Sequence, residues 1–282
     1  MNGSLRDYDR PADRIRQHRQ ADSRPVVVVE GPSDARLIRE AYSGAYASFP
    51  TGTRSTAIEA ALKLHEWKMP NFACIVDRDF SNDLEEYESG PLPLHPYENA
   101  DLEAMLTRMN AFRALLLELG SEDKIVYMGG AEAVTCILQD IVAPITRLRA
   151  ANAAMGWGLA FDKVDLADKI DIRTLSLNLD GYCSALISKN PDPPPKQVLL
   201  SFATGRAKLP YEPKCPRGSN PYYRGRDLLA AAGVALRKKI GSCDKSTTGS
   251  EHLARILRAI GCQQFANSTW SEELQELLSS NT

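Results

Sequence analysis

The sequence lacks the features of a secreted or membrane-spanning protein. It has no apolar signal region at its N-terminus and no apolar stretch of the roughly 18 residues that a membrane-spanning helix needs. Its six cysteines are dispersed, and no two of them have the spacing of a zinc ribbon. The four histidines form no pair with the spacing of metal ligands. We therefore expect a cytoplasmic protein with free thiols.

Three common catalytic motifs are also missing. No G-x-x-x-x-G-K-[ST] segment is present, so the chain should not hydrolyse ATP through a P-loop. No G-x-G-x-x-G follows the first apolar segment, which disfavours a nicotinamide cofactor. No G-x-S-x-G is present either, which disfavours an α/β-hydrolase.

Charge is unevenly distributed along the chain, although the formal net charge is only -2. Residues 77–103 contain nine acids and one base, Arg78, whereas residues 196–239 contain ten bases and two acids. An acidic metal pocket beside a basic groove is typical of an enzyme that cuts a polyanion. The alternative is two solvated surfaces of opposite sign.

The order of the apolar segments predicts an α/β fold, with a Rossmann-like parallel sheet flanked by helices. Residues 26–29 and 72–76 are short apolar runs typical of buried parallel strands, and residues 45–49 form a weaker one. Amphipathic segments at 33–42 and 57–68 separate these runs, so right-handed crossovers are expected.

We expect three regions along the chain. They are a polar arm or helix at 1–24, the sheet domain at 25–128, and a mainly helical C-terminal region with basic, proline-rich loops at 129–282. The sheet domain should contain a helix over 100–119 and a last strand at 124–128.

Finer expectations concern two segments of the sheet domain. Thr56 and Glu59 have the spacing of a capping box for the helix at 57–68, and His65 lies on its apolar stripe as a core residue. Residues 92–95 are expected to form a further short strand.

Carboxylates follow two of the predicted strands. Glu30 comes directly after residues 26–29, and Asp77 and Asp79 come directly after residues 72–76. Since ligand sites in parallel sheets lie at the carboxyl ends of the strands, these side chains should converge on one edge. Carboxylates placed together repel one another unless a cation lies among them, and oxygen ligands suit Mg²⁺ or Mn²⁺.

The two motifs, E-G-x-x-D and D-x-D after apolar strands, resemble those of the Toprim domain. The resemblance implies a Mg²⁺-dependent nuclease in which Glu30, Asp77 and Asp79 are the catalytic and metal-binding residues. Gly31 would let a phosphate approach the backbone. Asp34 would either bind the metal or cap the helix that follows. The resemblance is firmest over residues 25–103.

A second acidic group, Glu98, Asp101 and Glu103, follows the D-x-D strand. It is similar to a segment of the standalone Toprim effectors of bacterial phage-defence systems. That resemblance implies that these residues bind a second metal or orient the first. The alternative is that they are favoured by the start of a helix, where negative charge is stabilising.

Tyrosines are interleaved with lysines and arginines over residues 208–226. This pattern suits the binding of single-stranded or looped RNA, because tyrosines can stack on nucleobases and cations can contact phosphates. The alternative is a surface loop whose tyrosines cover the core. The predicted nucleic-acid-binding residues are Arg78, Lys208, Lys214, Arg217, Tyr222, Tyr223, Arg224 and Arg226.

The resemblance implies a toxic anti-phage nuclease that acts on RNA, with tRNA as one candidate, under the control of a partner ATPase. These effectors are related to the overcoming-lysogenization-defect nucleases, which carry an ATPase that this chain lacks. A homo-oligomer is a separate option that the sequence leaves open. Two alternatives stay open. One is a phosphatase of the haloacid-dehalogenase type with Asp77 as nucleophile, and the other is a non-catalytic Toprim module that binds nucleic acid or protein.

Overall fold

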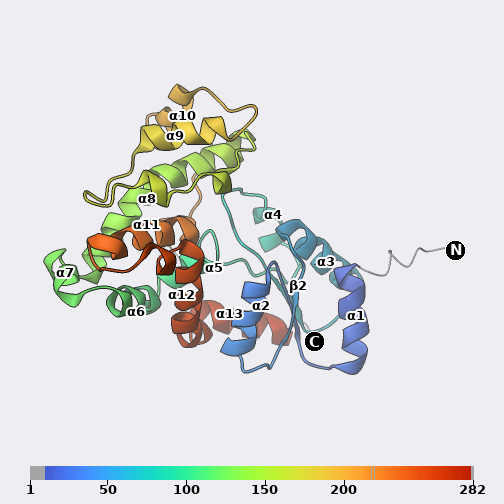
Figure 1. Ribbon diagram of the computed structural model, residues 1–282. Coiled ribbons are helices and arrows are strands. Elements are labelled where there is room, and N and C mark those ends of the chain that lie inside the picture. The colour runs from blue at the N-terminus through green and yellow to red at the C-terminus, as the bar shows by residue number, and fades with distance from the viewer. Residues whose placement is uncertain (1–9, 217, 219, 281–282) are drawn as a thin grey trace. The chain divides into compact units, whose positions relative to one another are not determined.

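The computed structural model describes residues 10–216, 218 and 220–280, which divide into two compact units (Figure 1). The first unit contains the described residues within 1–78, 83–98 and 262–282, and the second those within 79–82 and 99–261. The division differs from the predicted boundary at residue 128, because the C-terminal segment belongs to the unit that holds the sheet.

The sheet of the first unit has three parallel strands in the order β2-β1-β3. These are β1 (Val26–Val29), β2 (Ala47–Pro50) and β3 (Phe72–Ile75). Val26 is aligned with Ala47 on one side and with Phe72 on the other. All four valines of β1 are buried, as expected of a central strand covered on both faces. The predicted α/β fold with a parallel sheet is therefore confirmed.

Helices cover both faces of this sheet (Figure 1). One face carries α1 (Pro11–Ala21) and α3 (Arg54–Glu66), and the other carries α2 (Pro32–Ala41) and α13 (Thr269–Ser280). Alternate strand residues face the α1 and α3 side, where they form one core cluster with Ile15 and the apolar residues of α3. Most of the predicted N-terminal arm that the structure describes is thus helix α1, with Ile15 fully buried.

A further chain segment extends the sheet beside β3. Leu94 forms a parallel bridge with Cys74, whose N–H donates to the Pro93 carbonyl at 2.8 Å. Further along, the Tyr97 N–H donates to the Val76 carbonyl at 3.1 Å. The short strand expected at 92–95 is present in this reduced form. The short helix α4 (Glu85–Glu88) lies between β3 and this segment along the chain.

The second unit is helical in its described residues. Its longest helix, α8 (Ala131–Met155), continues through Pro144. Helix α12 contributes to both units. The helices not yet given are α5 (Leu102–Thr107), α6 (Asn110–Leu119), α7 (Glu122–Tyr127), α9 (Leu179–Ser188), α10 (Lys196–Ala203), α11 (Gly225–Lys238) and α12 (Ser250–Ala266). In the described part of the chain, no helix combines the length and apolar character needed to cross a lipid bilayer.

Two predicted elements of residues 100–128 are wrong. The strand expected at 124–128 is the end of helix α7, which starts with two acids and buries only Ile125, while Val126 and Tyr127 are exposed. The helix expected over 100–119 is divided into α5 and α6, because Met109 takes an extended conformation between them. A short apolar run has no period that distinguishes a strand from a helical turn.

The apolar stripe expected for α3 is correct at Ile58 and Ala61, which are buried, and wrong at Leu62 and His65. His65 is exposed and Leu62 is 43% exposed, whereas Leu64 is fully buried. The helix begins three residues earlier than expected, and its cap is Thr53, whose Oγ1 accepts the Thr56 N–H at 3.2 Å.

Helices α5 and α11 of the second unit approach closely at Gly225. A Cβ atom at this position would lie 2.2 Å from the backbone nitrogen of Ala104 and 2.5 Å from the carbonyl carbon of Glu103. Backbone atoms cannot yield as a flexible side chain does, so only glycine fits the start of α11.

We expect Gly225→Ala to lower the free energy of unfolding by about 3 kcal/mol, because the methyl group forces the two helices apart. Denaturant unfolding measures this change. Gly249→Ala is the matched control, since no atom of the described chain lies within 4 Å of its added Cβ. Equal stability of the two variants would show that α5 and α11 are not packed in this way.

Candidate active site at the carboxyl edge of the sheet

Glu30 and Asp77 lie together where β1 and β3 end. Val29 is aligned with Ile75, so the chain segments that follow leave the sheet side by side. The Asp77 N–H donates to Glu30 Oε1 at 2.8 Å. The structure thus brings together two carboxylate residues that are far apart in the sequence, at the edge where a parallel sheet binds ligands.

Cys74 lies in β3, two residues before Val76, and is fully buried. Burial, and to a smaller extent the charge of Glu30, raises the pKa of its thiol well above the ordinary value. Cys74 is therefore a neutral core side chain and not a nucleophile.

Asp34 connects helix α2 to the segment beside β3. Its Oδ2 accepts the Gly31 N–H at 3.1 Å, and its Oδ1 accepts the Tyr97 hydroxyl at 2.9 Å. Of the two roles expected for Asp34, the helix-capping role is the one observed. Tyr97 is buried and stacks on Trp270 of α13, with ring centroids 5.3 Å apart. Sequence reasoning marked the tyrosine before Glu98 but missed its pairing with Trp270, because a stacked pair so distant in sequence leaves no local pattern.

Arg78 was predicted to bind nucleic acid, but its side chain contacts other residues at the carboxyl edge of the sheet. Its Nε donates to the Tyr97 carbonyl at 2.7 Å, and its guanidinium forms an ion pair with Glu88. Arg54, which was not predicted, donates to the Arg78 carbonyl at 3.1 Å and forms an ion pair with Asp83 at 2.8 Å. These two arginines stabilise the chain as it leaves β3.

Asp79 belongs to the second unit and is exposed. Its φ of 51° lies in the left-handed region, which aspartate adopts more readily than most residues. Its N–H donates to the Ala100 carbonyl at 2.9 Å, and its own carbonyl accepts the Tyr222 hydroxyl. The backbone of Asp79 is therefore fixed on both sides while its side chain reaches solvent.

Tyr222 and Tyr223 are core residues, and the prediction that they stack on bases is wrong. Tyr223 is 1% exposed and shares a hydrogen bond of 3.0 Å with Thr107, while Tyr222 packs edge-on against Phe80. Burial raises the pKa of Tyr223. The buried Asn99 side chain accepts the Tyr223 N–H at 3.1 Å. The expected alternative, tyrosines that cover the core, is the observed arrangement.

Asp101 and Glu103 have structural partners inside the second unit. Asp101 Oδ1 accepts the Ala104 N–H at 2.7 Å as the cap of α5, and the same oxygen accepts the Gly225 N–H at 3.0 Å. Glu103 is buried in an ion pair with Arg258. The helix-start alternative therefore accounts for both residues. Glu98 is half-buried and follows Tyr97 in the first unit, at the same edge as Asp77.

The remaining predicted nucleic-acid-binding residues have different environments. Arg224 is mostly buried in an ion pair with Asp162, and Arg226 pairs with Glu251 at 3.3 Å. Lys208 and Lys214 are exposed, so their predicted role stays a prediction. Arg217 lies outside the described residues.

Comparison of the chain with models of known protein families and with curated proteins gives no match. The resemblance to the Toprim domain therefore rests on the two motifs and on the position of their carboxylates.

The donor set at the edge suits a hard divalent cation. Within the described residues, no three carboxylate, histidine or cysteine side chains are grouped as a closed metal site requires. Mg²⁺ does not require such a group, because it usually keeps several waters and is held by one or two carboxylates together with substrate phosphates. Glu30 and Asp77 on adjacent strand ends fit that demand. Participation of Asp79 stays a prediction.

The environment of Asp101 makes a prediction about pH and stability. Burial, with a smaller contribution from the charge of Glu103, raises the Asp101 pKa from 3.8 to about 7. The folded protein therefore keeps a proton that the unfolded chain loses near the ordinary pKa. Between these two values, unfolding releases a proton, so the contribution of Asp101 to stability falls as pH rises.

We expect Asp101→Asn to be more stable relative to wild type at pH 7.5 than at pH 4, because its amide oxygen keeps the cap without a buried charge. Asp101→Ala should lose about 2 kcal/mol at pH 4, since the cap is gone, and less at pH 7.5, where wild type also bears the cost of the buried charge. Denaturant unfolding of both variants at the two pH values measures this, with the exposed Asp123→Asn as control. A pH-independent difference between Asp101→Asn and wild type would contradict the raised pKa.

Proposed function

We propose that this protein is a divalent-metal-dependent nuclease of the Toprim type. The observation that carries the proposal is the hydrogen bond between the Glu30 carboxylate and the Asp77 N–H at the carboxyl ends of adjacent parallel strands. An acidic residue at each strand end, in the order and spacing of the Toprim motifs, supports hydrolysis of a phosphodiester.

Each residue of the edge has a distinct part in this proposal. Glu30 and Asp77 would hold the divalent ion, and the Asp77 N–H fixes the orientation of the Glu30 carboxylate. When bound, the ion supplies stabilisation of the charge that develops on the scissile phosphate. Glu30 is also placed to move a proton during attack by water. Asp34 and Tyr97 act as positioning residues, because they fix the first turn of α2 behind Glu30.

The substrate and setting of this activity are further parts of the proposal. The resemblance to standalone Toprim effectors supports RNA, with tRNA as the first substrate to test, and a role as a toxic anti-phage effector. Such an activity has to be restrained in the cell. Because the chain has no P-loop motif, an ATPase that senses infection would be a separate partner.

A phosphatase of the haloacid-dehalogenase type is less well supported by the geometry. That class needs only the D-x-D pair and gives no role to Glu30, whereas the Glu30 carboxylate contacts the backbone of Asp77 directly. Trapping of an aspartyl-phosphate analogue with fluoroberyllate would favour the phosphatase.

We expect Glu30→Gln and Asp77→Asn each to reduce cleavage at least about 100-fold, because each removes one anionic oxygen ligand while keeping the side-chain shape. The measurement is end-mapping of cellular RNA and DNA after induced expression, followed by cleavage of the identified substrate by purified protein with Mg²⁺.

Glu86→Gln is the matched control, because it removes an exposed carboxylate of helix α4 in the same acidic segment. It should cut like wild type, and all three variants should unfold at the wild-type temperature. Full cleavage by both Glu30→Gln and Asp77→Asn would remove the proposed site.

A further inference from the structure

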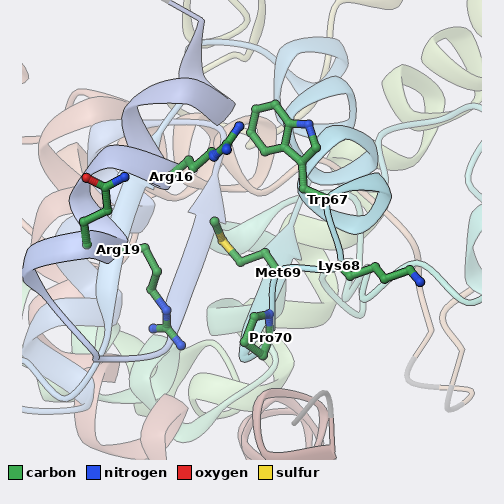
Figure 2. A pocket seen from close by; sticks show the side chains of 7 residues that line it. Arg16, Arg19, Trp67, Lys68, Met69 and Pro70 are labelled. Carbon is green, nitrogen blue, oxygen red and sulfur yellow. The ribbon is translucent and has the colours of Figure 1, made fainter.

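A basic pocket lies at the amino end of the sheet, the edge opposite Glu30 and Asp77. It has a volume of about 300 Å³ and lies in the first unit, between the end of α1 and the segment that connects α3 to β3. Its lining includes three cationic side chains, Arg16, Arg19 and Lys68. The polar side chain of Gln20, the indole of Trp67 and the apolar side chains of Met69 and Pro70 complete it (Figure 2).

One cation of the pocket, Arg16, lies over an aromatic ring, while Arg19 and Lys68 extend away from that ring (Figure 2). The Arg16 guanidinium lies 5.0 Å from the centroid of Trp67, and Figure 2 shows it extending from α1 toward the indole. Lys63 Nζ lies 5.6 Å from the same centroid. Arg19 is held in place by donation to the Ser23 carbonyl at 3.0 Å. The contacts of Arg16 and Lys63 orient the ring and concentrate positive charge around it.

Acidic residues near the pocket do not cancel this charge. None of the described residues that line it is acidic. Two of the nearby acids along the chain have their own partners, since Asp22 pairs with Arg24 at 2.5 Å and Glu66 pairs with Lys63 at 2.8 Å, and the third, Asp13, lies one turn before Arg16 and does not line the pocket. Trp67 itself is half-buried, in contrast to Trp270, which is 1% exposed in the core.

The chemistry of this lining selects the ligand class. An indole and two apolar side chains suit a planar ring, and separate cations around them suit the successive phosphates of a strand, so a nucleotide unit satisfies both parts. An acidic peptide would use the cations and leave the indole without a planar partner. The volume is at the lower end of the range of ligand pockets, about 300 to 1,000 Å³, which is room for one nucleotide.

We propose that this pocket binds one nucleotide of a single-stranded nucleic acid, with the base beside Trp67 and the phosphates that flank it near the separate cations Arg16, Arg19 and Lys68. The choice of a strand over a free nucleotide rests on the proposed nuclease function. The pocket would anchor the substrate at the edge of the first unit away from Glu30 and Asp77, so that it contributes to substrate affinity and not to the chemical step.

The test is fluorescence anisotropy of a labelled single-stranded RNA 12-mer, titrated with the full chain in EDTA. Base stacking is worth about 1–3 kcal/mol, so Trp67→Leu should weaken binding about 10-fold or more. Trp157→Leu, which alters a half-exposed tryptophan of the second unit, should bind like wild type. Arg16→Gln should weaken binding and reduce the slope of log Kd against log salt by about 0.7.

Arg14→Gln is the charge control, because it removes an equal charge from the exposed surface of α1 outside the pocket. If Arg14→Gln and Arg16→Gln weakened RNA binding equally, the RNA would be attracted by the general positive charge of α1 and would not occupy the pocket. Equal affinity of wild type and Trp67→Leu would also overturn the proposed pocket. If AMP bound as tightly as the 12-mer, the pocket would not be specific for a single strand. If polyglutamate bound in a Trp67-dependent way, the ligand would be an acidic peptide and not a nucleotide.

The outcome is separable from that of the nuclease proposal. Binding in EDTA requires no divalent ion and no cleavage. If Glu30→Gln cuts like wild type while Trp67→Leu loses affinity, the nuclease site fails and the nucleotide pocket stands. If Trp67→Leu binds like wild type while Glu30→Gln is inactive, the pocket fails and the nuclease site stands.

Discussion

The arrangement of the carboxyl edge depends on the hydrogen bond from the Asp77 N–H to the Glu30 carboxylate. The bond joins the ends of β1 and β3, which are adjacent in the sheet although β2 comes between them along the chain. Without a donor, two carboxylates at neighbouring strand ends would repel each other in the absence of a cation. The backbone N–H orients one of them while the edge stays anionic, which is the condition for holding a divalent ion.

The elements around this bond keep the edge in one conformation. Tyr97 reaches Asp34 on α2, and its ring stacks on Trp270 of the C-terminal helix. The Trp270 indole N–H donates to the Pro96 carbonyl at 2.9 Å, so the last helix closes against the same segment. Helix α13 therefore helps to position the first turn of α2 through Tyr97, although it is the most distant element in sequence.

Much of this edge could be predicted from local sequence, and the rest could not for a physical reason. Buried parallel strands leave a visible mark, a run of apolar residues such as Val26–Val29, and a carboxylate at the end of such a run is conspicuous. The same local reasoning failed for Tyr222 and Tyr223. Lysine and arginine residues lie near them in the sequence, and we took this to mean that the tyrosines lie on the same exposed surface. At Asp101 this reasoning allowed for the helix start but missed the second donor, the N–H of Gly225, a residue far along the chain. Contacts of this kind are set by packing and leave no periodic signal.

The most direct test of the central claim is a titration of the protein with Mn²⁺ followed by electron paramagnetic resonance, in which free Mn²⁺ gives the signal. The account predicts a bound ion in wild type and in Glu86→Gln, with affinity at least about 10-fold weaker in Glu30→Gln and in Asp77→Asn. The same Mn²⁺ affinity in all four proteins would contradict a metal site at the ends of β1 and β3.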